Sequence, residues 1–200
     1  MFATDSLYLN TLPAHPRPQR LETLNSYLKR LAQSNAIHHV ATFSHLTGIA
    51  QPERLLELNP PPNWGQLGQA TQRTEPELLS MTPHFLVHKF GREQTPGRFL
   101  ANSTSQDLRW CPLCLAEQGY YQLPWYFLHL QACPQHGLYL LDTCPHCYSK
   151  ISLKSTSLQL NYCPYCNGDL RQAVGQSLTP QELTSCQHTW DDLVYLLTAQ

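Results

Sequence analysis

The sequence predicts a mainly α-helical protein with small zinc-stabilised α+β modules: an N-terminal helix-turn-helix domain followed by a tandem zinc-ribbon or zinc-finger domain. Two observations carry this prediction. Apolar residues recur at helical spacing in the first half of the chain. Paired cysteines in the second half are typical of tetrahedral zinc sites. We expect a helical domain at 1–100, a zinc domain at 101–175 and a C-terminal helical segment at 176–200.

The first helices are predicted from apolar stripes that follow a proline-rich, irregular start. One stripe begins at Leu21 and comprises Leu21, Leu24, Leu28, Leu31 and Ala32, with Tyr27 beside it. A second helix is predicted over 37–47, ending at Gly48 and with three residues inward: Val40, Phe43 and Leu46. A short third helix is predicted over 53–58, before a run of prolines.

Residues 64–71 and 74–81 predict two further short helices joined by a tight polar turn. Thr74 and Glu77 have the spacing of a capping box, which would start the second of them. Two short helices with such a turn indicate a helix-turn-helix unit. The same pattern also fits an ordinary small α-helical domain, so both interpretations stand.

The remaining elements frame the cysteine-rich region. Residues 91–107 are rich in Gly, Pro, Ser, Thr and Asn, which predicts a linker between the two halves. The C-terminal segment returns to helical spacing, with a start signal at Thr179 and an apolar stripe of Trp190, Leu193, Leu196 and Leu197.

Four two-ligand knuckles lie between residues 111 and 166, each with a proline directly after its first ligand. They are Cys111–Cys114, Cys133–His136, Cys144–Cys147 and Cys163–Cys166. Eighteen residues separate the first two knuckles and fifteen separate the last two, which fits two zinc ions bound by sequential pairs. A crossed pairing, first with third and second with fourth, would give a RING-like brace and remains the alternative.

All eight ligand positions are filled, so neither ion keeps an open position for water or substrate. We therefore expect two structural Zn²⁺ ions and no catalysis, and the sequence carries no motif for a phosphate loop, a nucleophile elbow or a catalytic zinc helix. Cys186 is expected to be a small buried apolar residue outside the metal sites, and His129 a weaker ligand candidate than His136. Tyr120, Tyr121 and Trp125 are expected to form the core of the first zinc module.

The net charge of −1 argues against tight binding of a nucleic-acid duplex by the whole surface. Residues 1–100 hold nine Lys and Arg against seven Asp and Glu, whereas residues 101–200 hold four against seven. Phosphate contacts are therefore placed in the first half, with four candidates that could equally be solvated: Arg73, Lys89, Arg92 and Arg98. No secretory signal or membrane-spanning run is recognisable, so a cytoplasmic location is expected.

Residues 22–32 and the ordered zinc pattern together resemble the TniQ family of transposition proteins. The zinc pattern comprises Arg109-Trp110-Cys111, Tyr120-Tyr121, Trp125, the four knuckles and the closing Gly168-Asp169-Leu170-Arg171. The resemblance covers roughly residues 14–172, with Thr23 and Tyr27 as mild departures. It implies a helix-turn-helix domain followed by tandem zinc fingers.

The resemblance also implies a role as a non-catalytic adaptor in Tn7-like transposition. Such an adaptor links target recognition to the AAA+ regulator TnsC, and through it to the transposase, in the bacterial cytoplasm at the nucleoid. The chain resembles the short members found with CRISPR-associated transposons, with a type V-K system as the first expectation and a Cascade-type system open. The expected partners are then TnsC and a CRISPR effector bound to guide RNA and target DNA, with RNA contact included. The alternative function is a sequence-specific, DNA-binding target selector of the helix-turn-helix and zinc-finger class.

Overall fold

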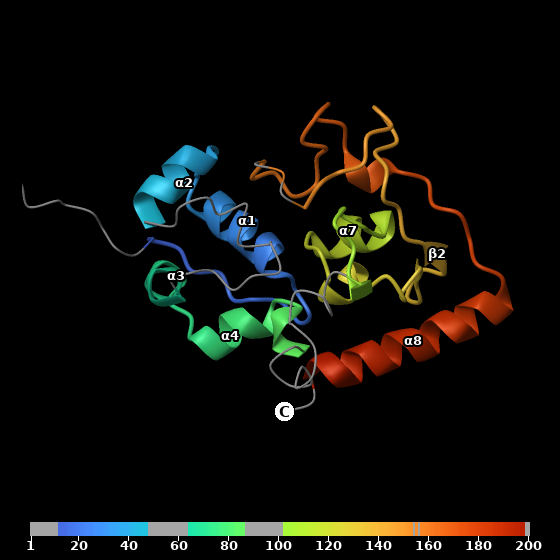
Figure 1. Cartoon of the computed structure of the whole chain (residues 1–200). Helices are drawn as coiled ribbons and strands as arrows, with labels where there is room; N and C mark the ends of the chain where they lie inside the picture. Colours follow the sequence, from blue (N-terminus) through green and yellow to red (C-terminus); the bar gives the residue numbers. More distant parts are fainter. Residues whose placement is uncertain (1–11, 48–63, 87–101, 154, 156, 199–200) are drawn as a thin grey trace, which may run out of the picture.

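The computed structural model describes residues 12–47, 64–86, 102–153, 155 and 157–198. The helical half comprises residues 12–47 and 64–86 and is drawn in blue to green in Figure 1. It lies beside the zinc half, which comprises residues 102–153 and 157–179 and is drawn mainly in yellow to orange. A long C-terminal helix, drawn in red, runs beneath the zinc half toward the helical half. This mainly helical architecture with one small sheet agrees with the predicted fold class.

Helix α1 (Leu24–Ser34) is the centre of the helical half. It begins after Thr23, whose hydroxyl accepts a hydrogen bond from the Ser26 backbone N–H. The predicted start at Leu21 is therefore wrong: Leu21 has a positive φ of 57° and precedes the cap. Tyr27 does not lie beside the stripe but is fully buried within it, because the core surrounds α1 on most sides.

Helix α2 (Val40–Thr47) is shorter than predicted and buries a different face. Phe43 is fully buried, but Leu46 is 39% exposed and Val40 is only half-buried, so the predicted inward set is wrong for Leu46. Ile37 precedes the helix and is buried all the same. The predicted stop at Gly48 and the predicted helix at 53–58 lie outside the described residues.

Helices α3 (Trp64–Thr71) and α4 (Glu75–Ser80) form the predicted pair. Glu77 accepts hydrogen bonds from the Thr74 backbone N–H and hydroxyl at 2.7 and 2.9 Å, which confirms the capping interaction. Gln72 makes the turn with a φ of 53°. Leu67, Ala70 and Leu78 pack into the same core as α1.

The two halves are joined through the segment that precedes α1. The Leu123 N–H donates to the Leu21 carbonyl at 2.7 Å, and the Thr23 N–H donates to the Tyr121 carbonyl at 3.0 Å. The Tyr121 N–H also donates to the Ser26 hydroxyl at 3.0 Å. These bonds fix α1 directly against the zinc half.

The predicted linker is wrong for its last residues. Thr104 forms an antiparallel bridge with Phe127, and Asp107 forms one with Ser152. Residues 102–107 are therefore part of the zinc half, whereas 91–101 lie outside the described residues. Polar composition predicted a loop, but backbone pairing with distant segments does not depend on composition.

The zinc half shares one hydrophobic core across both of its modules. Its elements are α7 (Pro112–Gln118), the 3-10 helices η2 (Leu123–Tyr126) and η3 (Leu170–Gln172), and the antiparallel strands β1 (Ala132–Cys133) and β2 (Leu138–Tyr139). Ala132 pairs with Tyr139, and Cys133 with Leu138. Fully buried Trp110 donates its indole N–H to the Leu170 carbonyl at 3.2 Å, which ties the first module to the second.

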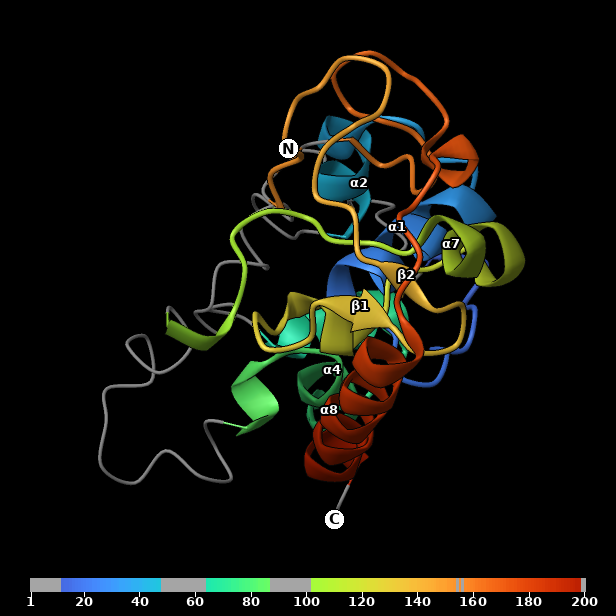
Figure 2. The ribbon, with the colours of Figure 1, turned by 90° about the vertical axis from the view of Figure 1, so that its right-hand side faces the viewer.

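Helix α8 (Pro180–Thr198) lies below β1 and β2 in Figure 2, and its predicted apolar stripe packs on the shared core. Leu193 and Leu197 are buried, and Trp190 and Leu196 pack against the shared core. Thr179 and Glu182 cap the first turn through reciprocal hydrogen bonds. Within the described ranges, no helix combines the length and apolar character needed to cross a bilayer.

Candidate metal centres

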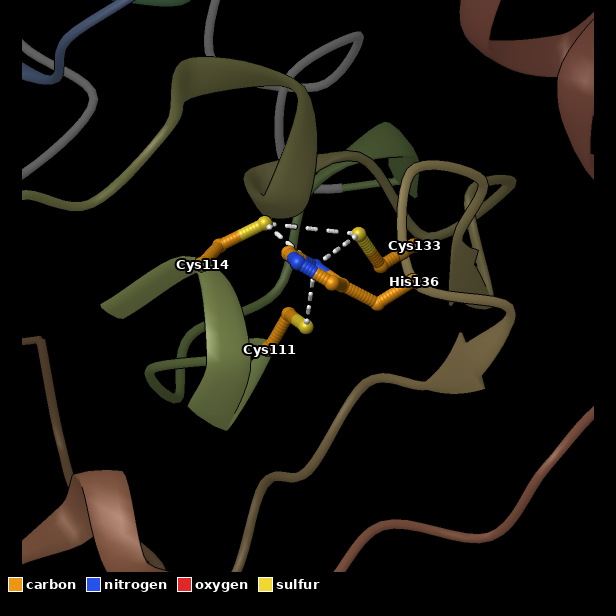
Figure 3. A group of neighbouring side chains, drawn as sticks. All are labelled: Cys111, Cys114, Cys133 and His136. Carbon is orange, nitrogen blue, oxygen red and sulfur yellow. Dashed lines mark hydrogen bonds between the residues drawn. The ribbon is translucent and has the colours of Figure 1, made fainter. Parts of the chain in front are cut away.

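The first cluster gathers Cys111, Cys114, Cys133 and His136 around one point (Figure 3). The His136 Nδ1 atom lies 3.2, 3.5 and 3.7 Å from the sulfur atoms of Cys114, Cys111 and Cys133, respectively. The Cys114 and Cys133 sulfur atoms are 3.4 Å apart. In a tetrahedron with Zn–S bonds near 2.3 Å, neighbouring sulfur atoms are separated by about 3.8 Å. The cluster is thus close to the size that a zinc ion requires.

Two different local structures present these ligands. Cys111 is the N-cap of α7, and Pro112 occupies the first helical position, so Cys111 and Cys114 face the cluster from one helical turn. Cys133 ends strand β1, and the turn after it closes with a hydrogen bond from the Gly137 N–H to the Cys133 carbonyl at 2.9 Å. Gly137 has a φ of 60°, which glycine adopts without steric strain.

A carboxylate outside the cluster orients the histidine ligand. Glu117 Oε1 lies 3.0 Å from His136 Nε2, on the side of the ring away from the sulfur atoms. The other oxygen of Glu117 accepts a hydrogen bond from the Gln135 side chain at 3.2 Å. Carboxylates placed this way fix the tautomer of a metal-binding histidine and strengthen it as a ligand. Glu117 was not among the predicted site residues; its position one turn after Cys114 on α7 is the only signal of this role that the sequence contains.

The second cluster gathers Cys144, Cys147, Cys163 and Cys166. The sulfur atoms of Cys144 and Cys166 are 3.7 Å apart, as are those of Cys147 and Cys163. Both distances match the edge of a zinc–thiolate tetrahedron, about 3.8 Å.

The third and fourth knuckles repeat the turn of the second one. In each, the residue four positions after the first cysteine donates its N–H to that cysteine's carbonyl at 2.9 Å. These residues are Tyr148 and Asn167, both with a φ of 58°. His146 lies inside the third knuckle but is not in the cluster, because its Nε2 atom lies 3.3 Å from the Asp169 carbonyl. A Cβ on Gly168 would lie 2.2 Å from the His146 ring, so any other residue there would require the His146 side chain to move.

The grouping of the ligands is sequential, not crossed. His136 completes the first cluster, whereas His129 is exposed and outside it. Three thiols with one imidazole, and four thiols, are donor sets that zinc prefers. Two tetrahedral Zn²⁺ ions can therefore be held, one in each cluster, and four protein ligands leave neither ion an exchangeable position.

The other predicted residues fall into three groups. Tyr121 and Trp125 are buried core residues, as predicted, and Tyr120 is half-buried. Cys186 is half-buried and donates its thiol to the Ala132 carbonyl at 3.2 Å, away from both clusters. Arg73 is half-buried beside Glu77, with 3.7 Å between its Nη1 atom and the carboxylate. The other three phosphate-contact candidates, Lys89, Arg92 and Arg98, lie outside the described residues.

Two buried cations were not found from the sequence. Arg109 donates from Nη1 to the Phe127 carbonyl at 2.9 Å and also bonds the Leu130 carbonyl, which fixes the chain before β1. Lys29, on α1, is 9% exposed and lines a small pocket against residues 151–153 and 157–164. Burial lowers the pKa of Lys29 to about 8. The pattern of polar residues on α1 gave no sign that this lysine faces the zinc half.

Comparison with known proteins identifies the family to which the chain belongs. A family model described as TniQ matches residues 13–140, which include the helical half, the first metal cluster and the β hairpin. A search of curated proteins found no match. The match ends before the third and fourth knuckles, so it covers less of the zinc half than the resemblance in the sequence suggested. Because the matched segment spans more than half of the chain, the chain belongs to the TniQ family of Tn7-like transposition adaptors.

Proposed function

We propose that the protein is a non-catalytic adaptor in RNA-guided, Tn7-like transposition. It would link a CRISPR effector bound to guide RNA and target DNA to the AAA+ regulator TnsC, and through TnsC to the transposase. The observation that carries this proposal is the TniQ match over residues 13–140, which implies an adaptor role in Tn7-like transposition. The chemistry of the metal clusters supports it, because closed zinc sites stabilise a fold and do not activate water.

The way the two halves join supports an adaptor that acts as one rigid body. Backbone hydrogen bonds at Leu21, Thr23 and Tyr121 connect α1 to the zinc half, and α8 packs along the same core. A rigid connection keeps two binding surfaces at a fixed distance and orientation, so little conformational entropy is lost when both are occupied.

Charge supports a function that does not require reading DNA sequence. The net charge is −1, and in RNA-guided systems base pairing with the guide reads the target. In helix-turn-helix proteins the start of the second helix contacts base edges. Here that start carries exposed Glu75 and Glu77. Hydrogen bonds from Thr74 lower the pKa of Glu77, so it is ionised at neutral pH and would repel phosphates.

The sequence-specific target selector remains the second candidate, since α3 and α4 have the order and tight turn of a helix-turn-helix unit. The two candidates differ in solution. An adaptor should sediment with TnsC assembled on DNA with ATP and should bind free duplex DNA weakly. A target selector should bind one DNA sequence with nanomolar affinity and a steep dependence on salt. Reconstituted RNA-guided insertion that proceeds equally well without this chain would refute the adaptor proposal.

A further inference from the structure

A groove of about 540 Å³ opens where the helical half meets the end of α8. Its walls come from three segments: residues 17–19 and 21–22 before α1, four residues between Arg73 and Met81, and Leu197–Thr198 at the end of α8. Both ribbon views place the C-terminal end of α8 near α4 (Figures 1 and 2). The volume falls within the range of about 300–1,000 Å³ that is usual for ligand pockets.

Two arginine side chains in the groove have guanidinium N–H groups that remain available as hydrogen-bond donors. Arg17 is exposed, and within the described part of the chain its side chain makes no hydrogen bond or ion pair. Arg73 lies 3.7 Å from Glu77 through its Nη1 atom and also interacts with the buried hydroxyl of Tyr27, but within the described residues its buried Nε atom has no hydrogen-bond partner. The other carboxylate, Glu22, is buried and already paired with Arg30 at 2.5 Å. A carboxylate that enters the groove would therefore meet arginine forks, which bind carboxylates in bidentate geometry.

The remaining walls combine apolar and neutral polar side chains. Leu21, Met81 and Leu197 contribute apolar surface, and methionine adapts readily to different apolar partners. Gln19, Ser80 and Thr198 supply neutral hydrogen-bonding groups. This mixture suits a peptide with one acidic and one apolar side chain.

Nucleic acid fits the same groove less well. None of the described lining residues is aromatic, so a base would have no ring to stack against. Glu77, whose side chain is 47% exposed, is ionised and would repel a phosphodiester. A peptide can offset the repulsion that its own carboxylate would meet, because its backbone N–H groups can donate to Glu77.

We propose that this groove binds an extended segment of a protein partner in which a carboxylate lies next to an apolar side chain. Resting on the proposed function, we assign that segment to the AAA+ regulator. A bound segment would contact the chain before α1, α4 and the end of α8 together, and so would add to the contacts that already join the two halves.

A charge reversal with a matched control tests the groove. Arg17→Glu should weaken binding to the ATP-assembled regulator by about tenfold or more, the value of one charge-assisted hydrogen bond. Arg20→Glu makes the same change of charge three residues away, at an exposed side chain that does not line the groove. It should leave the affinity within about twofold, a change below 0.5 kcal/mol. Equal affinities for the two variants would overturn the proposal.

A photo-crosslinking amino acid in place of exposed Ser80 identifies the occupant, with the same group at Val174, which is 93% exposed, as the control. In the complete complex, Ser80 should crosslink to a regulator segment that contains an acidic and an apolar residue. Crosslinks from Ser80 to nucleic acid, or none while the regulator stays bound, would refute the peptide assignment. If the wild-type chain does not bind the regulator at all, the proposed function fails, and the assignment to the regulator fails with it.

Discussion

Glu117 accepts a hydrogen bond from the Nε2–H of His136 at 3.0 Å, so the one histidine of the metal clusters is oriented by a carboxylate on the same helix that supplies Cys114. Removing this interaction with Glu117→Ala should weaken zinc binding at the first cluster by about 10–100-fold, as outer-shell changes at zinc sites do. The measurement is competition for zinc with a chromophoric chelator. Asp191→Asn, an exposed change on α8, should leave both sites unaffected. Equal zinc affinities for wild type and Glu117→Ala would show that the carboxylate does not support the ligand.

The zinc content of cysteine variants should distinguish the seven cysteines in the metal clusters from Cys186, which lies outside them. The wild-type chain should contain two zinc ions, measured by elemental analysis of purified protein. Cys163→Ser should lose the second ion and destabilise the shared core, because metal binding at a structural site is folding energy. Cys186→Ser should keep both ions, since its thiol bonds the Ala132 carbonyl outside the clusters. One zinc per wild-type chain would contradict the assignment of the second cluster.

The ligands were predictable from the sequence because a zinc site imposes local spacing. Each knuckle needs only four consecutive residues, and ordinary loop lengths favoured sequential pairing without excluding the crossed one. The orienting group was not predictable in the same way. Glu117 is a single acidic residue on a short helix, and its contact with His136 depends on how α7 packs against the hairpin.

The helical half shows the same limit. Apolar periodicity located α1 and α8, but it placed Leu21 inside a helix and Leu46 in the core. Leu21 instead takes a left-handed conformation and accepts a hydrogen bond from Leu123, an interaction between residues about a hundred positions apart. Local patterns carry no information about such tertiary contacts, which override helical propensity.

Lys29 makes stability depend on pH in the alkaline range. Its pKa is about 8 in the folded protein, because burial disfavours the charged amine, against an ordinary 10.5. Between pH 8 and 10.5 the unfolded chain binds more protons than the folded protein, so the stability of the fold rises with pH over this range. Below pH 8 the burial of Lys29 destabilises the folded protein by its full amount, about 3 kcal/mol. Tyr121 lines the same pocket, but burial raises its pKa, so it stays neutral.

Lys29→Met should therefore stabilise the protein at pH 7, by up to about 3 kcal/mol. Its advantage over wild type should shrink by about 2 kcal/mol by pH 9.5. Urea unfolding of both proteins at each pH measures the difference, and effects of pH on the zinc sites cancel between them. A difference that does not change with pH would mean that Lys29 stays charged in the folded state.

Tyr148 occupies a backbone position that suits glycine or asparagine. Three knuckles end in a residue with a φ near 60°, namely Gly137, Tyr148 and Asn167. Tyrosine is strained there by contact between its Cβ and the backbone, which costs about 1–2 kcal/mol. Its ring contributes little stabilising contact, because Tyr148 is 81% exposed. Tyr148→Gly should thus stabilise the zinc-bound protein by about 0.5–1 kcal/mol after the added flexibility of the unfolded chain is counted.

Tyr148→Ala separates the backbone from the ring in this measurement. Alanine removes the ring but keeps the Cβ, so its stability should stay close to that of wild type, within about 0.5 kcal/mol. The midpoint of urea unfolding in zinc-saturated buffer should then be highest for the glycine variant. If both variants are less stable than wild type by the same amount, the tyrosine ring stabilises the knuckle and the strain at this position is negligible. If the glycine variant is more stable than both the alanine variant and wild type, the exposed tyrosine at this position lowers the stability of the knuckle.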